Sequence, residues 1–350
     1  MCAKLRFAAA AGAALLAIAS AGPAAQQSAA PGELDRFLSS ELAARPADIA
    51  RVHEGRPYVT PLPGAVDREV VVAGIVRIDA PSERTVATIR DIENFERGPG
   101  FIQTKRLSTP PVLGDFASYR VDPDDLTALR KCTPGDCDVK LAQSTFALLK
   151  PINWSAPDVR EQVSAIARRA ALDYVSAYRH GGNSELAVYA DAERPTFVER
   201  EFADMVQRAS ILPSRLPMLT QYLLQYPKAD QPSAFEDFFY WSVAEFGLKP
   251  VFRLNHVVIH KVPQPSPVRY AIATKQLYAN HYFHTALEIR ALIDAGAGNG
   301  SHYLLSLSMA RSDGLTGLFG GLVKSKAQSG AREGMLKALG ATREAVERAR

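Results

Sequence analysis

A stripe of apolar side chains at helical spacing runs through the C-terminal part of this 350-residue chain. A helix that carries it would be a rod of about 45–50 Å, so the rest of the chain must supply a surface of comparable length. Seven glycines between Gly314 and Gly340 weaken this helix, at about 1 kcal/mol each in a helix interior. Either the glycines let the helix lie close against a sheet, or residues 314–321 are not helical. The stripe consists of Leu315, Phe319, Val323, Ala327, Ala331, Met335, Leu339, Thr342 and Val346.

Extended segments precede the stripe, and they predict that its packing surface is a sheet. The clearest is the continuous β-branched run from Glu69 to Ile78, which is typical of a strand. Asp79-Ala80-Pro81 ends the run, and Ser82 begins a short helix that ends near Phe95. Later strands are predicted over residues 235–241, 251–262, 270–283 and 302–311.

The middle of the chain is predicted to be mostly helical. Residues 116–121 and 138–149 are interpreted as strands, but from Ser155 to Tyr178 apolar residues recur every three or four positions. Gly181-Gly182 follows this helix and is expected to end it. A second helical region is predicted over residues 198–224, with breaks at its two prolines. We therefore expect a helical insertion at about residues 150–230.

Two cysteines of the chain stand close together, Cys132 and Cys137, with Pro-Gly between them. Pro-Gly favours a tight turn that brings its flanks together, so a disulfide across the turn is predicted. The alternative is a two-thiolate metal site. A structural zinc needs four ligands, and no Cys-x-x-Cys motif or nearby histidine pair supplies the remainder.

The N-terminus has the pattern of a secretory signal. Lys4 and Arg6 precede an apolar run, and Ala19-Ser20-Ala21 follows it as a small-residue cleavage site. The run is about a dozen residues long, whereas a membrane-spanning helix needs about 20. We predict a signal peptide over residues 1–21, cleaved after Ala21 or after Ala25, and an exported protein that is periplasmic or secreted. Residues 22–65 are expected to form a flexible leader and a short helix.

The charge balance argues against binding of nucleic acid. The formal net charge of the whole chain is +4, and its cations are spread along the sequence rather than gathered in a basic patch with interleaved aromatic residues. Nucleic acid is therefore excluded as a predicted partner.

The order of these elements resembles the START-like helix-grip (SRPBCC) superfamily. The matching segments are residues 72–95 and 238–346, with Ile78-Asp79-Ala80-Pro81-Ser82-Glu83 at the first strand-to-helix turn and Phe246-Gly247-Leu248-Lys249-Pro250 and Ala273-Thr274-Lys275-Gln276-Leu277-Tyr278 in later strands. The resemblance implies an α+β fold over residues 66–350, in which a curved antiparallel sheet grips a long C-terminal helix. It also implies an apolar cavity that binds a lipid, a sterol or another hydrophobic small molecule. Some members of the superfamily are cyclases or hydrolases, so the fold leaves catalysis open.

Aromatic and polar side chains of the later strands are candidates for contact with such a molecule. Aromatic residues cluster at Phe238, Phe239, Tyr240, Trp241, Phe252, Tyr278, Tyr282 and Phe283, and Asn255, His256, Lys275 and Asn280 could anchor a polar head. The predicted ligand-binding set is Tyr240, Trp241, Phe252, Asn255, His256, Lys275, Tyr278 and Tyr282. The alternative is that the aromatic side chains fill a solid core.

The sequence assigns no catalytic residue, metal or cofactor. His281, His284 and Glu288 could share one face of a helix and bind a metal, but the sequence before them favours a strand, on which the two histidines point to opposite faces. His256 and His260 would lie about 13 Å apart along a strand, too far for one metal. An enzyme that uses His256, His281 or His284 as acid or base is the alternative function, and it requires an imidazole that faces the cavity beside a carboxylate. A third alternative is a structural envelope protein with a filled core.

Residues 315–323 are uncharged up to Lys324. We predict that this entrance to the last helix is buried against the sheet. A transient membrane contact is the alternative that stays open, although an interfacial helix usually carries cations along its whole polar face.

Overall fold

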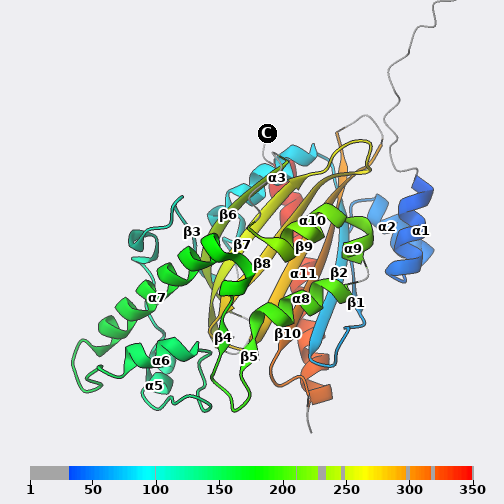
Figure 1. Cartoon of the computed structure of the whole chain (residues 1–350). Helices are drawn as coiled ribbons and strands as arrows, with labels where there is room; N and C mark the ends of the chain where they lie inside the picture. The colour runs from blue at the N-terminus through cyan, green and yellow to red at the C-terminus, as the bar shows by residue number, and fades with distance from the viewer. Residues whose placement is uncertain are drawn as a thin grey trace, which may run out of the picture.

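The protein is described by a computed structural model over residues 31–348, except for residues 99, 210, 228–233, 246–248, 297–299 and 317–319. One antiparallel sheet of eight strands forms its centre, in the order β1-β2-β10-β9-β8-β7-β6-β3 (Figure 1). The predicted α+β class, an antiparallel sheet with a long C-terminal helix and inserted helices, is therefore confirmed. The predicted signal peptide and most of the leader lie outside the described residues.

The strands of this sheet are β1 (Tyr58–Leu62), β2 (Glu69–Ile78), β3 (Phe101–Arg106), β6 (Phe235–Glu245), β7 (Pro250–Lys261), β8 (Val268–Ala279), β9 (Phe283–Asp294) and β10 (His302–Ser312). A separate pair consists of β4 (Val188–Tyr189) and β5 (Thr196–Phe197). The helices are α1 (Pro31–Glu41), α2 (Pro46–His53), α3 (Ser82–Arg90), α4 (Ile92–Phe95), η1 (Leu113–Phe116), α5 (Pro123–Leu129), α6 (Gln143–Leu149), α7 (Val159–Gly181), η2 (Gly182–Glu185), α8 (Val198–Arg208), α9 (Ile211–Arg215), α10 (Pro217–Gln225) and α11 (Gly320–Arg348).

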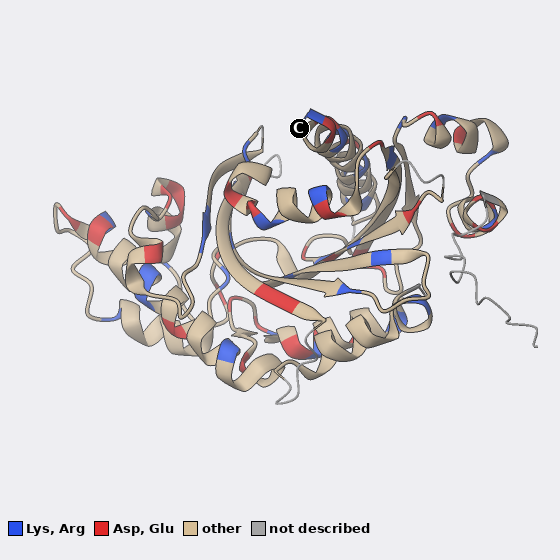
Figure 2. Cartoon of the chain, turned by 90° about the horizontal axis from the view of Figure 1, so that it is seen from above, with Lys and Arg blue, Asp and Glu red and all other residues tan. Residues whose placement is uncertain are grey.

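Both faces of the sheet are covered by helices. Seen from above, the sheet curves around α3 and α11 on its concave face, and the inserted helices lie along its convex face (Figure 2). Because both faces are buried, strands such as β2 are apolar along nearly their whole length rather than alternating. Two apolar cores result: the concave core includes Val72, Ile272 and Leu339, and the convex core includes Phe202 and Leu277.

The C-terminal helix starts later than the apolar stripe predicts. Leu315 lies in a turn after Gly314, whose φ is +71°, and α11 begins at Gly320, while Phe319 is among the residues that are not described. Close packing of α11 depends on a glycine of the sheet instead. A Cβ atom at Gly74 in β2 would lie 2.8 Å from Cδ1 of Leu339.

The sequence-based assignment of strands needs correction at several points, and β1 and β3 were not predicted. Residues 116–121 and 138–149 are not strands: the first follows η1, and the second contains α6, in which Phe146 and Leu149 are buried one helical turn apart. A short apolar run fits both the helical and the strand period, so the sequence pattern alone did not distinguish a helix from a strand here. The strand predicted over residues 270–283 ends at Ala279, and β9 was missed altogether. The chain turns at Tyr282, whose φ is +60°, without the glycine or proline that usually marks a turn.

The helical insertion is longer than predicted, because helical segments occupy the chain from η1, soon after β3, to α10, before β6. Its main helix α7 ends as predicted at Gly182, which has a φ of +69°. A Cβ atom there would lie 1.8 Å from the carbonyl oxygen of Tyr226, so only glycine fits. The predicted disulfide between Cys132 and Cys137 is confirmed.

Candidate functional site

The curvature of the sheet separates the predicted ligand-binding residues into two groups. Tyr240 belongs to the concave core, and Asn255 pairs directly with it across β6 and β7, so the two share that face. Trp241, Phe252, His256, Lys275 and Tyr278 face the inserted helices on the convex side. Tyr282 lies in the turn between β8 and β9, where its hydroxyl oxygen accepts a hydrogen bond from the backbone N–H of Lys249. The eight residues therefore do not form one site.

Polar side chains gather on the concave face around Tyr240. We call this group the concave cluster; it consists of Glu96, Thr104, Tyr240, Ser242, Arg253, Asn255 and Gln276. The hydroxyl of Tyr240 donates to Oε1 of Glu96 at 2.8 Å. Arg253 donates to the hydroxyl of Ser242 at 2.9 Å and lies 3.7 Å from the Glu96 carboxylate. Burial, together with the neighbouring negative charge of Glu96, raises the pKa of Tyr240 well above its usual value, so this phenol stays a hydrogen-bond donor.

The polar character of the concave face continues onto β9. Arg290 forms an ion pair with Glu288 at 2.7 Å, and its guanidinium lies 5.4 Å from the centre of the Phe95 ring. Charged side chains on the inner face of a curved sheet are costly to bury unless they are paired. The inner surface is therefore amphipathic rather than purely apolar, which differs from the apolar lining that the sequence predicts.

Asn255, in the concave cluster, has a buried amide nitrogen without a hydrogen-bond partner among the described residues. Its side chain is 2% exposed, and its Nδ2 atom has no hydrogen-bond partner. Leaving such a donor unpaired costs about 1–3 kcal/mol, and unpaired buried donors in native proteins usually meet a water or a ligand. Asn255 can thus donate to an oxygen atom of a bound molecule.

The concave cluster lies away from the part of the sheet that contacts α11. The helix packs mainly against β2, with further contacts to β1 and α3. The concave cluster lies on β3, β6, β7 and β8, together with Glu96 after α4, and its strands are on the other side of β9 and β10 from β2. The C-terminal helix therefore packs against one side of the sheet, near the edge strand β1.

A second polar group lies on the convex face, between the sheet and the insertion. We call it the buried relay; it consists of Lys275, Tyr178, His256 and Asp237. The Nζ atom of Lys275 donates to the Tyr178 hydroxyl at 3.1 Å. This hydroxyl lies 3.3 Å from Nδ1 of His256, and Nε2 of the same ring lies 3.1 Å from the Asp237 carboxylate. Lys275 also donates to Oδ1 of Asn183.

Burial controls the charge states of the relay. It lowers the pKa of the Lys275 ammonium group well below the usual value, and it lowers the pKa of His256. Burial alone would raise the pKa of Asp237, but hydrogen bonds from His256 and Tyr222 lower it. The His256 ring can therefore be neutral, with its Nε2–H donated to an ionised Asp237. This chain of groups can pass a proton, and it also fastens α7 to β6, β7 and β8.

The other two candidate histidines also contact carboxylates. His281 lies in the turn after β8, with Nε2 2.8 Å from Asp125, and His284 in β9 contacts Asp313. Each of the three candidate imidazoles thus has a carboxylate neighbour, which is one of the two conditions of the enzyme alternative; the other is that the imidazole faces a cavity. No group of three or more metal-ligating side chains is found in the part of the chain that the structure describes.

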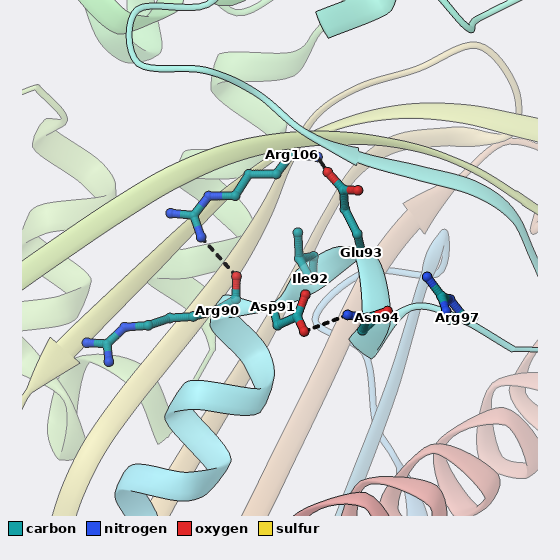
Figure 3. A pocket seen from close by; sticks show the side chains of 7 residues that line it. All are labelled: Arg90, Asp91, Ile92, Glu93, Asn94, Arg97 and Arg106. Carbon is teal, nitrogen blue, oxygen red and sulfur yellow. Dashed lines mark hydrogen bonds between the residues drawn. The ribbon is translucent and has the colours of Figure 1, made fainter.

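Two pockets among the described residues lie elsewhere, and neither has a purely apolar lining. The first, of about 250 Å³, lies where α3 and α4 meet β3 (Figure 3). Its lining is Arg90, Asp91, Ile92, Glu93, Asn94, Arg97 and Arg106. The second, of about 210 Å³, lies between the ends of β3, β6 and β7 and the insertion. Phe252 of the predicted ligand-binding set lines it, as does Asn280, which the sequence suggested as an anchor for a polar head. None of the three candidate histidines lines either pocket.

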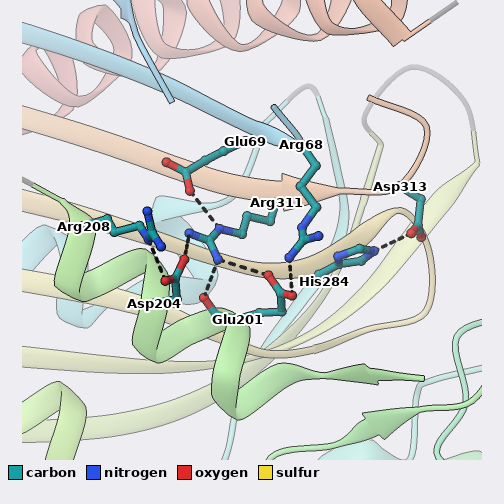
Figure 4. Close-up of polar contacts among 8 residues, drawn as sticks. All are labelled: Arg68, Glu69, Glu201, Asp204, Arg208, His284, Arg311 and Asp313. Atoms are coloured by element: carbon teal, nitrogen blue, oxygen red, sulfur yellow. Dashed lines mark hydrogen bonds and ion pairs between the residues drawn. The ribbon is translucent and has the colours of Figure 1, made fainter. Parts of the chain in front are cut away.

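A third charged group joins the insertion to β2 and β10 of the sheet (Figure 4). Arg311 in β10 is 1% exposed, and its guanidinium contacts Glu69 in β2 and both Glu201 and Asp204 in α8. Arg68 also contacts Glu201, at 2.5 Å. Because every charge in this group is paired, it serves as a polar junction between sheet and insertion.

Sequence reasoning missed several members of these groups. Glu96 follows the four-residue helix α4, which the sequence pattern did not distinguish from the preceding helix α3. Tyr178 was interpreted as part of an ordinary apolar stripe. A detectable signal did exist for Asp237, because alternation along β6 places it on the same face as Phe239 and Trp241.

No helix among the described residues is long and apolar enough to cross a membrane. Comparison of the sequence with models of known protein families and with curated proteins gives no match.

Proposed function

We propose that this protein is an exported START-like helix-grip protein that holds an amphipathic, lipid-like molecule against the concave face of its sheet. The ligand's polar group would meet the concave cluster, and its apolar part would lie between the sheet and α11. Two observations support the resemblance: two short helices follow β2, and α11 closes the chain after a run of antiparallel strands. The disulfide agrees with export to an oxidising compartment, for which we propose the periplasm.

The unpaired amide of Asn255 is the observation that carries this proposal. A core that served only for stability would gain by replacing this group with an apolar one, because an unpaired buried donor is unfavourable. A ligand oxygen would satisfy it. Charged neighbours such as Arg253 and Glu96 favour a molecule with a polar head over a plain hydrocarbon.

Burial of the ligand's apolar part would supply most of the affinity. Enclosing about 300 Å² of apolar surface at about 25 cal/mol per Å² contributes about 7 kcal/mol before the costs of association. The polar head would fix the orientation of the ligand and add to the strength of binding, because its oxygen atom would be left without a donor if Asn255 were absent.

Native mass spectrometry of the protein purified from its own host tests the proposal. We expect a stoichiometric lipid-like molecule in the wild type and a strong reduction in Asn255→Leu. The matched control is Thr285→Val, which removes another buried, unpaired polar atom, but on β9 opposite Arg311 on the convex face. Both variants should fold at least as stably as the wild type, and only the first should lose the ligand. Wild-type protein that carries no lipid, or equal retention in both variants, would contradict the proposal.

The contact between His256 and Asp237 favours one alternative, an enzyme that acts on a hydrophobic substrate. Incubation of the purified protein with the lipids extracted from its host distinguishes the two. Consumption of one lipid that stops in His256→Gln would indicate catalysis, whereas recovery of the bound molecule unchanged supports a carrier.

A further inference from the structure

The first turns of α11 expose apolar side chains to solvent. Leu322 is 61% exposed, the largest value among the exposed large apolar residues of the described chain, and Val323 is 42% exposed. The prediction that this segment is buried against the sheet is correct for Leu315, which is 5% exposed, and wrong for Leu322 and Val323. An explanation for these two exposed side chains is therefore needed.

Cations follow these two residues along the helix. Lys324, Lys326 and Arg332 lie in the first half of α11, and no acidic residue occurs in this helix before Glu333. A helix surface with adjacent leucine and valine and flanking cations has the chemistry of a site that meets anionic lipid headgroups.

The strand directions bring two further exposed apolar residues to the same end of the sheet. β6 and β10 run parallel, because four antiparallel steps separate them, and β3 runs antiparallel to β6. The end of β10, from which the chain leads to α11, therefore lies at the same end as the start of β3. Phe101 and Ile102 at that start are 37% and 57% exposed. Lys249, between β6 and β7, is at this end as well.

We propose that this end of the molecule docks on an anionic phospholipid surface. We call the docking surface the apolar rim; it consists of Phe101, Ile102, Leu322 and Val323, with Lys324 and Lys326 beside it. The apolar side chains would enter the headgroup region while the lysines contact phosphate groups. The inference rests on the proposed function in one respect: docking would serve the exchange of a lipid-like molecule with the membrane. The docking itself depends only on the side chains of this surface.

Vesicle sedimentation with the full mature protein tests the docking. We expect binding to phosphatidylglycerol-containing vesicles that is at least roughly 10-fold tighter than binding to pure phosphatidylcholine vesicles and that weakens with salt. The double variant Lys324→Gln/Lys326→Gln should bind anionic vesicles roughly 10- to 30-fold more weakly. Leu322→Glu/Val323→Glu should reduce the binding at least as much.

The control is Leu148→Glu, a change of another exposed leucine, 47% exposed, in α6 of the insertion. This variant should bind vesicles like the wild type. Because none of the substituted residues is buried, the melting temperatures of the variants should match that of the wild type, which separates loss of docking from misfolding. Absence of vesicle binding, equal binding to both vesicle types, or an equal effect of Leu148→Glu would each overturn the proposal. Ligand retention, measured without vesicles, should stay unchanged in the rim variants, so its loss would instead bear on the proposed function.

Discussion

The side-chain amine of Lys275 lies 3.1 Å from the phenolic oxygen of Tyr178, although the two residues are 97 positions apart in the sequence. The contact joins β8 of the sheet to α7 of the insertion inside a fully buried region. Phe202 in α8 also packs against this amine, with its ring centre 4.0 Å from Nζ of Lys275. Because this amine forms no ion pair with a carboxylate among the described residues, burial dominates and lowers its pKa.

We predict that Lys275→Met changes how stability depends on pH. The unfolded lysine has a pKa of about 10.4, whereas the native group has a lowered one, so between the two values the unfolded chain binds more protons. The free energy of unfolding of the wild type should therefore rise with pH across this window. In Lys275→Met this rise should be smaller. Urea unfolding at pH 7, 8 and 9 measures both slopes, below the range in which buried tyrosines titrate. Identical slopes would contradict a lowered pKa for Lys275.

We predict that Arg311→Met lowers the free energy of unfolding by about 3–5 kcal/mol, because it leaves the buried Glu69 without its cation and Glu201 and Asp204 with fewer partners. The comparison is Arg169→Met, which removes a surface pair with Asp173 in which both side chains are more than half exposed. That change should cost less than about 1 kcal/mol. Urea unfolding of both variants gives the values, and similar losses would show that the Arg311 junction is not specially stabilising.

A larger residue at Gly74 should displace α11. In Gly74→Val the new side chain would occupy space held by Leu339, Met335 and Val59, so we expect a loss of about 1–3 kcal/mol. Gly74→Ala should cost less, because it adds a single methyl group and two of the three nearest atoms lie toward the ends of the flexible Leu339 and Met335 side chains. Thermal unfolding orders the variants as wild type, alanine, valine. Valine at no cost would mean that α11 is not held tightly against β2.

Removal of the disulfide should have a modest effect. Cys132 and Cys137 close a loop with a sequence separation of 5, and a loop this short restricts the unfolded chain by about 2 kcal/mol. Cys132→Ser/Cys137→Ser should therefore lower the melting temperature without loss of the fold. Circular dichroism of the variant, compared with the wild type in reducing buffer, checks this, and the two should agree. A collapse of the fold in either sample would show that the hairpin does more than brace its own loop.

Local sequence decided the features that depend on neighbouring residues. The Pro-Gly turn placed Cys132 beside Cys137, Gly182 ended α7, and the apolar stripe of α11 followed the helical period. Where a short apolar run fits either period, as in α6, or where a turn lacks glycine and proline, as at Tyr282, the sequence pattern was not sufficient.

Tertiary structure alone decided which layer covers each face of the sheet. Alternation along a strand places Tyr240 and Trp241 on opposite faces, but it does not say that α11 shares one face and α7 the other. The partners of Lys275 and Asn255 depend on that choice, because they come from distant segments or are absent. Helical and strand periods are set by backbone geometry within a few residues, whereas the environment of a buried polar group is set by whatever segments pack around it after folding.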